Sequence, residues 1–342
     1  MSQVADDLSV AWYQACDLIR SQLPTLAANH SVWILPSLES ALFEVSQVLV
    51  DRNAEMGGAK TKALFVKGQD PAFEVLGSAL SAAGLDTRFC SAEEFRSPAS
   101  SFDPVKSEVL FVGFAQNSRF TGEVFDFTAT RAHILASGAK AAVVRVNYEQ
   151  VFAETVKPEP WEIVVTVLWS GAALVTLGER FRVSPKSAPY QMPRSLIHAV
   201  VQELVAPGGP GSQQLIEDFE WKLPKPFRAV HQPGVTRVWD RVIFTSEQLD
   251  GSWVCEKLAD AMKAAGCAWT EIDSATTSGC WDAEATFKRA DERRQEWLRN
   301  NLRGLLNERD IRGMVQIPIQ TVKRVTSEKI LQALESVATS HK

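Results

Sequence analysis

The most constraining feature of this sequence is a continuous apolar run from Ile163 to Leu168, in which most residues are β-branched. Such a run is typical of a strand buried on both faces of a parallel sheet. It ends at Ser170-Gly171, and a second short apolar run follows from Leu174 to Val183. A buried strand that ends in a turn of small residues is where an open α/β sheet presents its chemistry. This turn contains no Lys, Cys, His or carboxylate, and that absence shapes the functional interpretation.

Strand and helix patterns alternate before this run, and one further helix is expected after it, which predicts a sheet with crossover helices. The predicted strands are Val32–Leu35, Ala63–Val66, Thr87–Cys90, Val109–Phe114 and Ala141–Val146. The predicted helices are Val4–Leu23, Leu38–Val50, Pro71–Ala83, one that opens after the polar loop Ala115–Gly122 and ends near Gly138, and Pro193–Val205. Ser37, with Ser40 three residues later, predicts an N-cap for the second of these helices.

The last third of the chain predicts a compact α+β module. Its expected strands are Arg237–Phe244, Ala268–Ile272 and Met314–Ile319, and its expected helices are Trp253–Ala265, Lys288–Leu306 and Ser327–Val337. A further helix is expected at Gln213–Phe219, and the prolines that follow it mark a domain boundary. We therefore expect an N-terminal arm over 1–30, a large α/β domain over 31–222 and a small α+β domain over 223–342.

Composition excludes several classes of protein. The chain has 342 residues and a net charge of −5, which argues against a broad nucleic-acid surface. No apolar run reaches the roughly 20 residues of a membrane span, and the N-terminus lacks the positive region of a signal peptide. The five cysteines are scattered and never spaced as a metal site, so we expect reduced thiols in a cytoplasmic protein without a metal.

Common catalytic motifs are missing from the sequence. It contains no phosphate-binding loop of the Gly-x-x-x-x-Gly-Lys type, no Gly-x-Gly-x-x-Gly after the first strand, no His-Glu-x-x-His and no Gly-x-Ser-x-Gly. The histidines are isolated from one another along the chain or, for His341, lie in its tail. Surface or structural roles suit them better than catalysis.

The polar residues at the ends of the predicted strands follow one another in an order that resembles a known family. Ser37 and Ser40 open the helix after the first strand, Asn117 with Thr121-Gly122 follows a later strand, Asn147 ends the next, and Trp169-Ser170-Gly171 ends the one after. This order resembles the large domain of fold-type I pyridoxal-phosphate enzymes, the aspartate aminotransferase superfamily. The resemblance implies an aminotransferase-like large domain, with a mainly parallel sheet flanked by helices, and a smaller C-terminal α+β domain. It also implies a homodimer or pairing with an active relative.

The same resemblance assigns positions to a cofactor cleft. Ser37 and Ser40 stand where the helix start binds the cofactor phosphate, and Asn117 and Thr121 stand in the loop that contacts the ring hydroxyl. Asn147 occupies the position of the aspartate that protonates the pyridine nitrogen. Ser170 and its neighbours stand where the Schiff-base lysine is expected, and a hydroxyl cannot replace an amine that forms imines. These six residues are the candidate vestigial cleft.

The leading hypothesis is a pseudoenzyme without catalytic residues or cofactor, which acts by binding a small molecule or a protein in the former cofactor cleft. One alternative is a pyridoxal-phosphate transferase or lyase with a displaced lysine, for which Lys186 is the residue to test and Lys157 is the other lysine nearby. Another is a cofactor-free enzyme that uses the same cleft. A Rossmann-like nucleotide or sugar binder ranks last, because the sequence has no glycine-rich turn after Leu35.

Overall fold

The structure of the protein is a computed structural model of the whole chain. The residues that it describes are 9–67, 69–97, 108–118, 122–137, 140–148, 157–168, 170–181, 191–205, 212–231, 236–239, 241–267, 269, 281–282 and 308–340. They form two compact units, Met1–Ser118 with Val124–Val205, and Arg119–Glu123 with Ala206–Lys342.

The first unit contains the large sheet and the helices around it. In chain order its elements are β1 (Ser9–Ala11), α1 (Trp12–Gln22), α2 (Pro24–Ala27), β2 (Ser31–Leu35), α3 (Leu38–Glu55), β3 (Lys62–Val66), α4 (Pro71–Ala82), β4 (Asp86–Cys90), α5 (Ala92–Arg96), β5 (Val109–Ala115), α6 (Thr128–Ala136), β6 (Ala142–Tyr148), β7 (Glu162–Val167), β8 (Ala173–Leu177), the 3-10 turn Glu179–Phe181, β9 (Gln191–Pro193) and α8 (Arg194–Val205).

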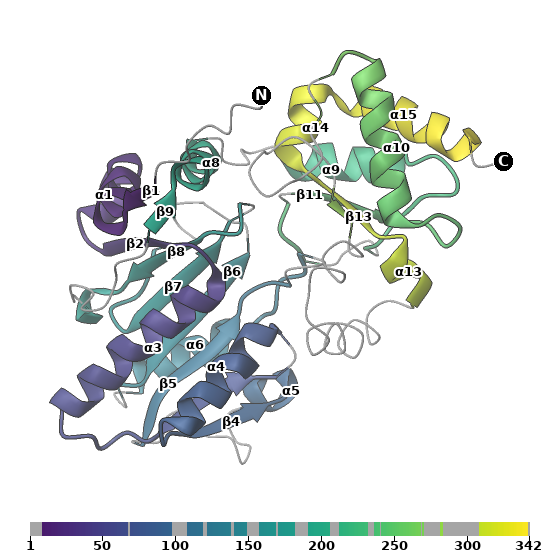
Figure 1. Cartoon of the computed structure of the whole chain (residues 1–342). Helices are drawn as coiled ribbons and strands as arrows, with labels where there is room; N and C mark the ends of the chain where they lie inside the picture. Colours follow the sequence, from purple (N-terminus) through teal and green to yellow (C-terminus); the bar gives the residue numbers. More distant parts are fainter. Residues whose placement is uncertain are drawn as a thin grey trace. The chain divides into compact units, whose positions relative to one another are not determined.

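The large sheet has seven strands in the order β2-β8-β7-β6-β5-β3-β4 (Figure 1). Strands β3 to β7 pair in parallel, whereas β8 is antiparallel to both of its neighbours, β7 and β2. β2 therefore points in the same direction as β7, and β8 alone runs against the rest of the sheet. The carboxyl ends of β2, β3, β5, β6 and β7 consequently share one edge of the sheet, which we call the carboxyl edge.

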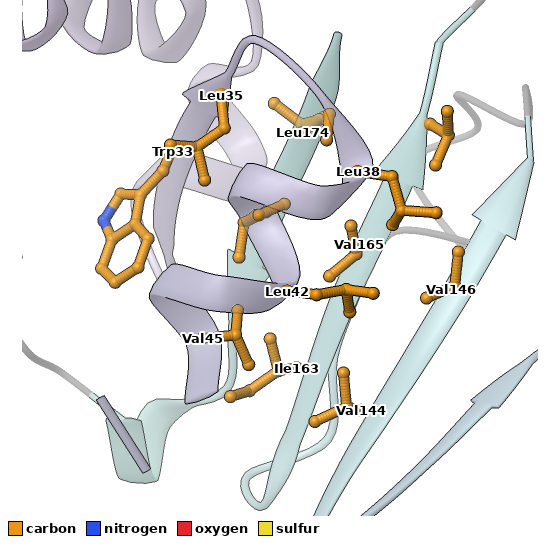
Figure 2. Packing of buried hydrophobic residues seen from close by; sticks show 14 of the residues in the cluster. Trp33, Leu35, Leu38, Leu42, Val45, Val144, Val146, Ile163, Val165 and Leu174 are labelled. Carbon is orange, nitrogen blue, oxygen red and sulfur yellow. The ribbon is translucent and has the colours of Figure 1, made fainter. Parts of the chain in front are cut away.

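Helices cover both faces of this sheet, and strands β5, β6, β7 and β8 are buried at every residue, whereas the edge strand β4 is partly exposed. α3 and α4 lie on one face, while α5 and α6 pack against the other (Figure 1). Figure 2 shows the packing on the α3 face, where Leu38, Leu42 and Val45 point toward apolar side chains of β6 and β7. The prediction of a mainly parallel sheet flanked by helices is confirmed.

The second unit builds a smaller sheet with its own core. Its elements are α9 (Ser212–Trp221), β10 (Arg228–Ala229), β11 (Arg241–Thr245), α10 (Gly251–Ala264), β12 (Trp281–Asp282), α13 (Glu308–Arg312), β13 (Val315–Pro318), α14 (Ile319–Val325) and α15 (Ser327–Ser340). The four strands pair antiparallel in the order β10-β11-β13-β12. Ile216 and Phe219 of α9 belong to the core of this unit, together with residues of α10 and α15. The unit is thus α+β, as predicted.

Several predicted boundaries were wrong for identifiable reasons. The first helix starts at Trp12, because the backbone of Ser9–Ala11 pairs with β9 instead of continuing a helix. α6 starts only at Thr128, because Val124 first forms a bridge with Asn117. The strand expected over Arg237–Phe244 begins at Arg241.

The expected helix Lys288–Leu306 and all but Trp269 of the expected strand Ala268–Ile272 lie outside the described residues.

Candidate functional site

The carboxyl edge gathers the predicted cleft residues of the first unit. Ser37 follows β2, Asn117 follows β5, Asn147 is the penultimate residue of β6 and Ser170 lies in the connection from β7 to β8. Thr121 lies outside the described residues. Parallel strands bring these positions to one edge although they are far apart in the sequence, which is the arrangement that makes such edges binding sites in α/β proteins.

Ser37 acts as the N-cap of α3. Its backbone is extended, and its hydroxyl oxygen accepts the N–H of Ser40 at 3.2 Å, as the sequence predicted. The two hydroxyls also lie 3.2 Å apart. Glu39 adds an acidic side chain to the first turn, which suits the positive end of the helix dipole. The hydroxyl of Ser37 is therefore engaged within the helix start.

Asn117 extends the pairing of β5 and β6 with its side chain. Its Nδ2 donates to the carbonyl of Tyr148 at 3.1 Å, and its Oδ1 accepts the N–H of Tyr148 at 2.9 Å. Asn117 is buried, so this amide satisfies backbone groups that would otherwise lack partners at the end of the strand. The geometry explains an asparagine here by strand pairing, without any ligand.

The loop after β3 also contains an amide side chain, that of Gln69, that pairs with a backbone, and it adds the carboxylate of Asp70. Gln69 donates to the carbonyl of Ala115 at 3.2 Å and accepts its N–H at 2.7 Å. Asp70 caps α4 by accepting the N–H of Ala72 at 2.8 Å, and its other oxygen accepts the hydroxyl of Tyr148. Tyr148 is fully buried, and its hydrogen bonds connect the end of β6 to Asn117 after β5 and to Asp70 after β3.

Asn147 points to the face of the sheet opposite α3 and meets an arginine. Arg145 donates from Nη1 to Oδ1 of Asn147 at 3.3 Å, and from Nε to Glu162 at 3.1 Å. Glu162 also forms two hydrogen bonds with Arg131, at 2.6 and 2.7 Å. Burial by itself raises the pKa of Glu162, but the hydrogen bonds from Arg131 and the charges of both arginines outweigh it, so the pKa lies below its ordinary value.

The β7–β8 connection is a tight turn held by a carboxylate from α8. Gly171 donates to the carbonyl of Leu168 at 2.9 Å, Leu168 donates to Ala172 at 2.8 Å, and Gly171 adopts a φ of 83° that glycine tolerates. The N–H of Ser170 donates to Oε1 of Glu203 at 2.7 Å. Both side chains are buried, so a carboxylate from α8 lies against the backbone of this turn.

Of the two lysines nearest to the turn in sequence, only Lys157 lies within the described residues. Lys157 lies before β7, at the opposite end of that strand, and Lys186 lies outside the described residues. The sequence of the turn itself, Leu-Trp-Ser-Gly-Ala, contains no lysine.

The described ranges also lack two other types of functional feature. Within the described ranges, no group of three or more His, Cys, Asp or Glu side chains is placed to hold a metal ion. Likewise, none of the described helices has the length and apolar character needed to cross a membrane.

Comparisons with known proteins give a likeness in structure only. No protein-family model and no curated protein sequence matches the chain. Among solved structures, a NifS-like protein matches with a TM-score of 0.58 at 10% identity, over 96% of this chain and 88% of the other. DndA from Streptomyces lividans matches with a TM-score of 0.56 at 12% identity, over 90% and 88% of the two chains. The phosphoserine aminotransferase SerC from Cytophaga hutchinsonii matches with a TM-score of 0.51 at 10% identity, over 95% and 87%.

The chain has the aminotransferase-like fold. The predicted fold class is thus confirmed along nearly the whole chain, and the Rossmann-like architecture is set aside. At such low identity the likeness concerns the fold alone, and the chemistry of the carboxyl edge depends on its own residues.

The sequence did not reveal the partners of these residues. The Asp70-Pro71 pair, which is typical of a helix start, could have indicated the cap of α4. Tyr148 and Glu203 gave no such signal, because their contacts join them to residues 78 and 33 positions away.

Proposed function

We propose that this chain is a non-catalytic aminotransferase-like protein that acts by binding a small molecule or a protein at the carboxyl edge of its large sheet. The observation that carries the proposal is the β7–β8 turn. There the N–H of Ser170 is held by the carboxylate of Glu203, and the turn sequence offers no amine.

Pyridoxal phosphate, the group that the resemblance implies, does not fit these residues. Chemistry with this cofactor needs an amine that forms and exchanges imines, and neither the Ser170 hydroxyl nor the Glu203 carboxylate can supply one. A carboxylate accepting the backbone N–H of the turn also fixes the backbone where the lysine is expected.

The surroundings of Asn147 support the same conclusion. A protonated pyridine nitrogen needs a negative partner, whereas here a neutral amide accepts a hydrogen bond from the cationic Arg145. A nearby positive charge disfavours protonation of the ring nitrogen. The amide of Asn117 is likewise bonded to the backbone of Tyr148 rather than turned toward a ligand.

The test uses the purified full-length chain and pyridoxal phosphate as the probe. The protein is incubated with the probe, its visible absorption is recorded, and it is then reduced with borohydride and mapped by peptide mass spectrometry. We expect no absorption band that saturates at one probe per chain and no lysine peptide modified with that stoichiometry. Random surface labelling is recognised by its spread over many lysines.

Two variants separate the proposal from its alternative. If one lysine is labelled stoichiometrically, Lys186→Ala and Lys157→Ala identify it by loss of the band. Labelling that depends on Lys186 would overturn the proposal and establish a displaced-lysine enzyme. An amino-acid-dependent activity abolished by Lys186→Ala would do the same.

We further propose that the chain works as a homodimer or pairs with an active relative, on the basis of the fold. Multi-angle light scattering of the isolated protein tests the first form directly. A mass of two chains at micromolar concentration supports a homodimer, and a mass of one chain that persists on concentration leaves pairing with a relative as the form to test by co-expression.

A further inference from the structure

The β7–β8 hairpin carries three buried hydroxyl groups that have no hydrogen-bond partner in the protein. They belong to Thr166 on β7, Ser170 in the turn and Thr176 on β8. The two threonines are fully buried. Among the described residues, these are the only buried hydroxyls without a partner, so their concentration on one hairpin calls for a physical explanation.

The register of the strands places the two threonines on one face. Thr166 lies opposite Leu174 and Val164 lies opposite Thr176, so Thr166 and Thr176 are diagonal neighbours whose side chains point to the same side. Asn147 is the register partner of Thr166 on β6 and therefore shares that side. We call Asn147, Thr166 and Thr176 the polar row, and it lies on the face opposite α3.

The polar row adjoins the hydrogen-bonded network of Arg145 and Glu162 through Asn147. Arg145 lies two residues before Asn147 on the same face, and its guanidinium joins Asn147 to Glu162. A buried hydroxyl that leaves water without gaining a partner destabilises the folded state, and two such groups side by side double that effect. A water molecule needs two to four polar partners, which the two hydroxyls and the neighbouring amide can supply.

We propose that the polar row binds ordered internal water, one molecule or more, hydrogen-bonded to the hydroxyls of Thr166 and Thr176. The sheet is then dry on its α3 face and hydrated on the opposite face. This inference concerns the interior of the sheet and does not depend on the function proposed for its edge.

The experiment counts long-lived internal waters in the intact protein by oxygen-17 relaxation dispersion. It compares the wild type with Thr166→Val, Thr176→Val and the matched control Thr130→Val. Thr130 is also buried, but its hydroxyl donates to the carbonyl of Phe95 at 2.9 Å. We expect the count to fall by at least one in Thr166→Val and in Thr176→Val, and to stay unchanged in Thr130→Val.

The opposite pattern would overturn the proposal. If the polar row holds no water, valine at position 166 or 176 fills the same volume without burying an unpaired hydroxyl. The melting temperature of these variants would then rise, and their number of long-lived internal waters would equal that of the wild type. Should the valine variants fail to fold, a high-resolution crystal structure of the wild type decides. Electron density for a water within hydrogen-bond distance of both hydroxyls supports the proposal, and continuous apolar packing there refutes it.

Discussion

The two faces of β6 and β7 are stabilised by different kinds of interaction. On the α3 face, β6 and β7 present Val144, Val146, Ile163 and Val165, which pack under α3 (Figure 2). On the opposite face the alternate residues of these strands include the ion pairs of Glu162. Both sets are buried, yet one is held by apolar contact and the other by directional polar bonds.

This difference teaches how central strands that are buried on both faces can be specified. An apolar face tolerates small shifts of side chains, because packing is not directional. A buried polar network tolerates few such shifts, because each polar group must keep its hydrogen-bond partner. The polar face therefore fixes how β6, β7 and α6 fit together, and the apolar face supplies most of the stabilisation.

The largest effect is expected from Glu162→Gln. The change leaves Arg131 and Arg145 without a negative partner in a buried site, so we expect the free energy of unfolding to fall by about 3–5 kcal/mol. Urea denaturation monitored by tryptophan fluorescence measures the loss. Glu159→Gln is the control, because Glu159 is exposed and bonds to Glu162 through its backbone N–H.

Acid should remove the difference between wild type and Glu162→Gln. The pKa of Glu162 is depressed in the folded state from its ordinary value of 4.5, so its stabilisation is complete above pH 4.5 and is lost as the pH falls through the folded-state pKa. The two proteins should keep a constant difference in unfolding free energy near neutral pH, and this difference should close only in acid below pH 4.5. A difference that closed above pH 5 would contradict a depressed pKa.

The apolar face is tested by two adjacent residues of α3. Leu42 is 1% exposed and Phe43 is 49% exposed. Leu42→Ala should lower the free energy of unfolding by about 2–5 kcal/mol through a cavity above β7. Phe43→Ala should cost at most about 1 kcal/mol although it removes a larger side chain. Equal losses would show that Phe43 is covered in solution.

A smaller effect is expected at the carboxyl edge from Asn117→Ala. The substitution leaves the N–H and carbonyl of Tyr148 without their partner, which should cost about 1–3 kcal/mol in the absence of any ligand. Tyr148→Phe is a useful companion, since it keeps this backbone pair and removes the hydroxyl that donates to Asp70. An Asn117→Ala protein as stable as the wild type would contradict the role of this amide in holding the strand ends together.

The smallest effect should come from the helix cap. Ser37→Ala removes the acceptor for the N–H of Ser40 and should cost about 1 kcal/mol. Ser40→Ala keeps that acceptor and should change stability by less. A differential scanning fluorimetry series over both variants is sufficient to rank them, and the reverse order would contradict the cap.

Much of the large sheet could be predicted because its signals are local. Continuous β-branched runs such as Ile163 to Leu168 give buried strands without reference to the rest of the chain. The cap at Ser37 and the proline after Asp70 likewise depend on neighbours in sequence. The start of the first helix could not be predicted, because Ser9–Ala11 pairs with Gln191–Pro193, far away along the chain.

The sequence by itself determined the alternation of strands and helices and the absence of a lysine from the β7–β8 turn, because periodicity and residue type are properties of the chain. Only the tertiary structure decided that Asn117 pairs with Tyr148, that Glu203 holds the turn and that two threonines share one face. Those contacts depend on strand register and helix placement, which are fixed when the whole core packs.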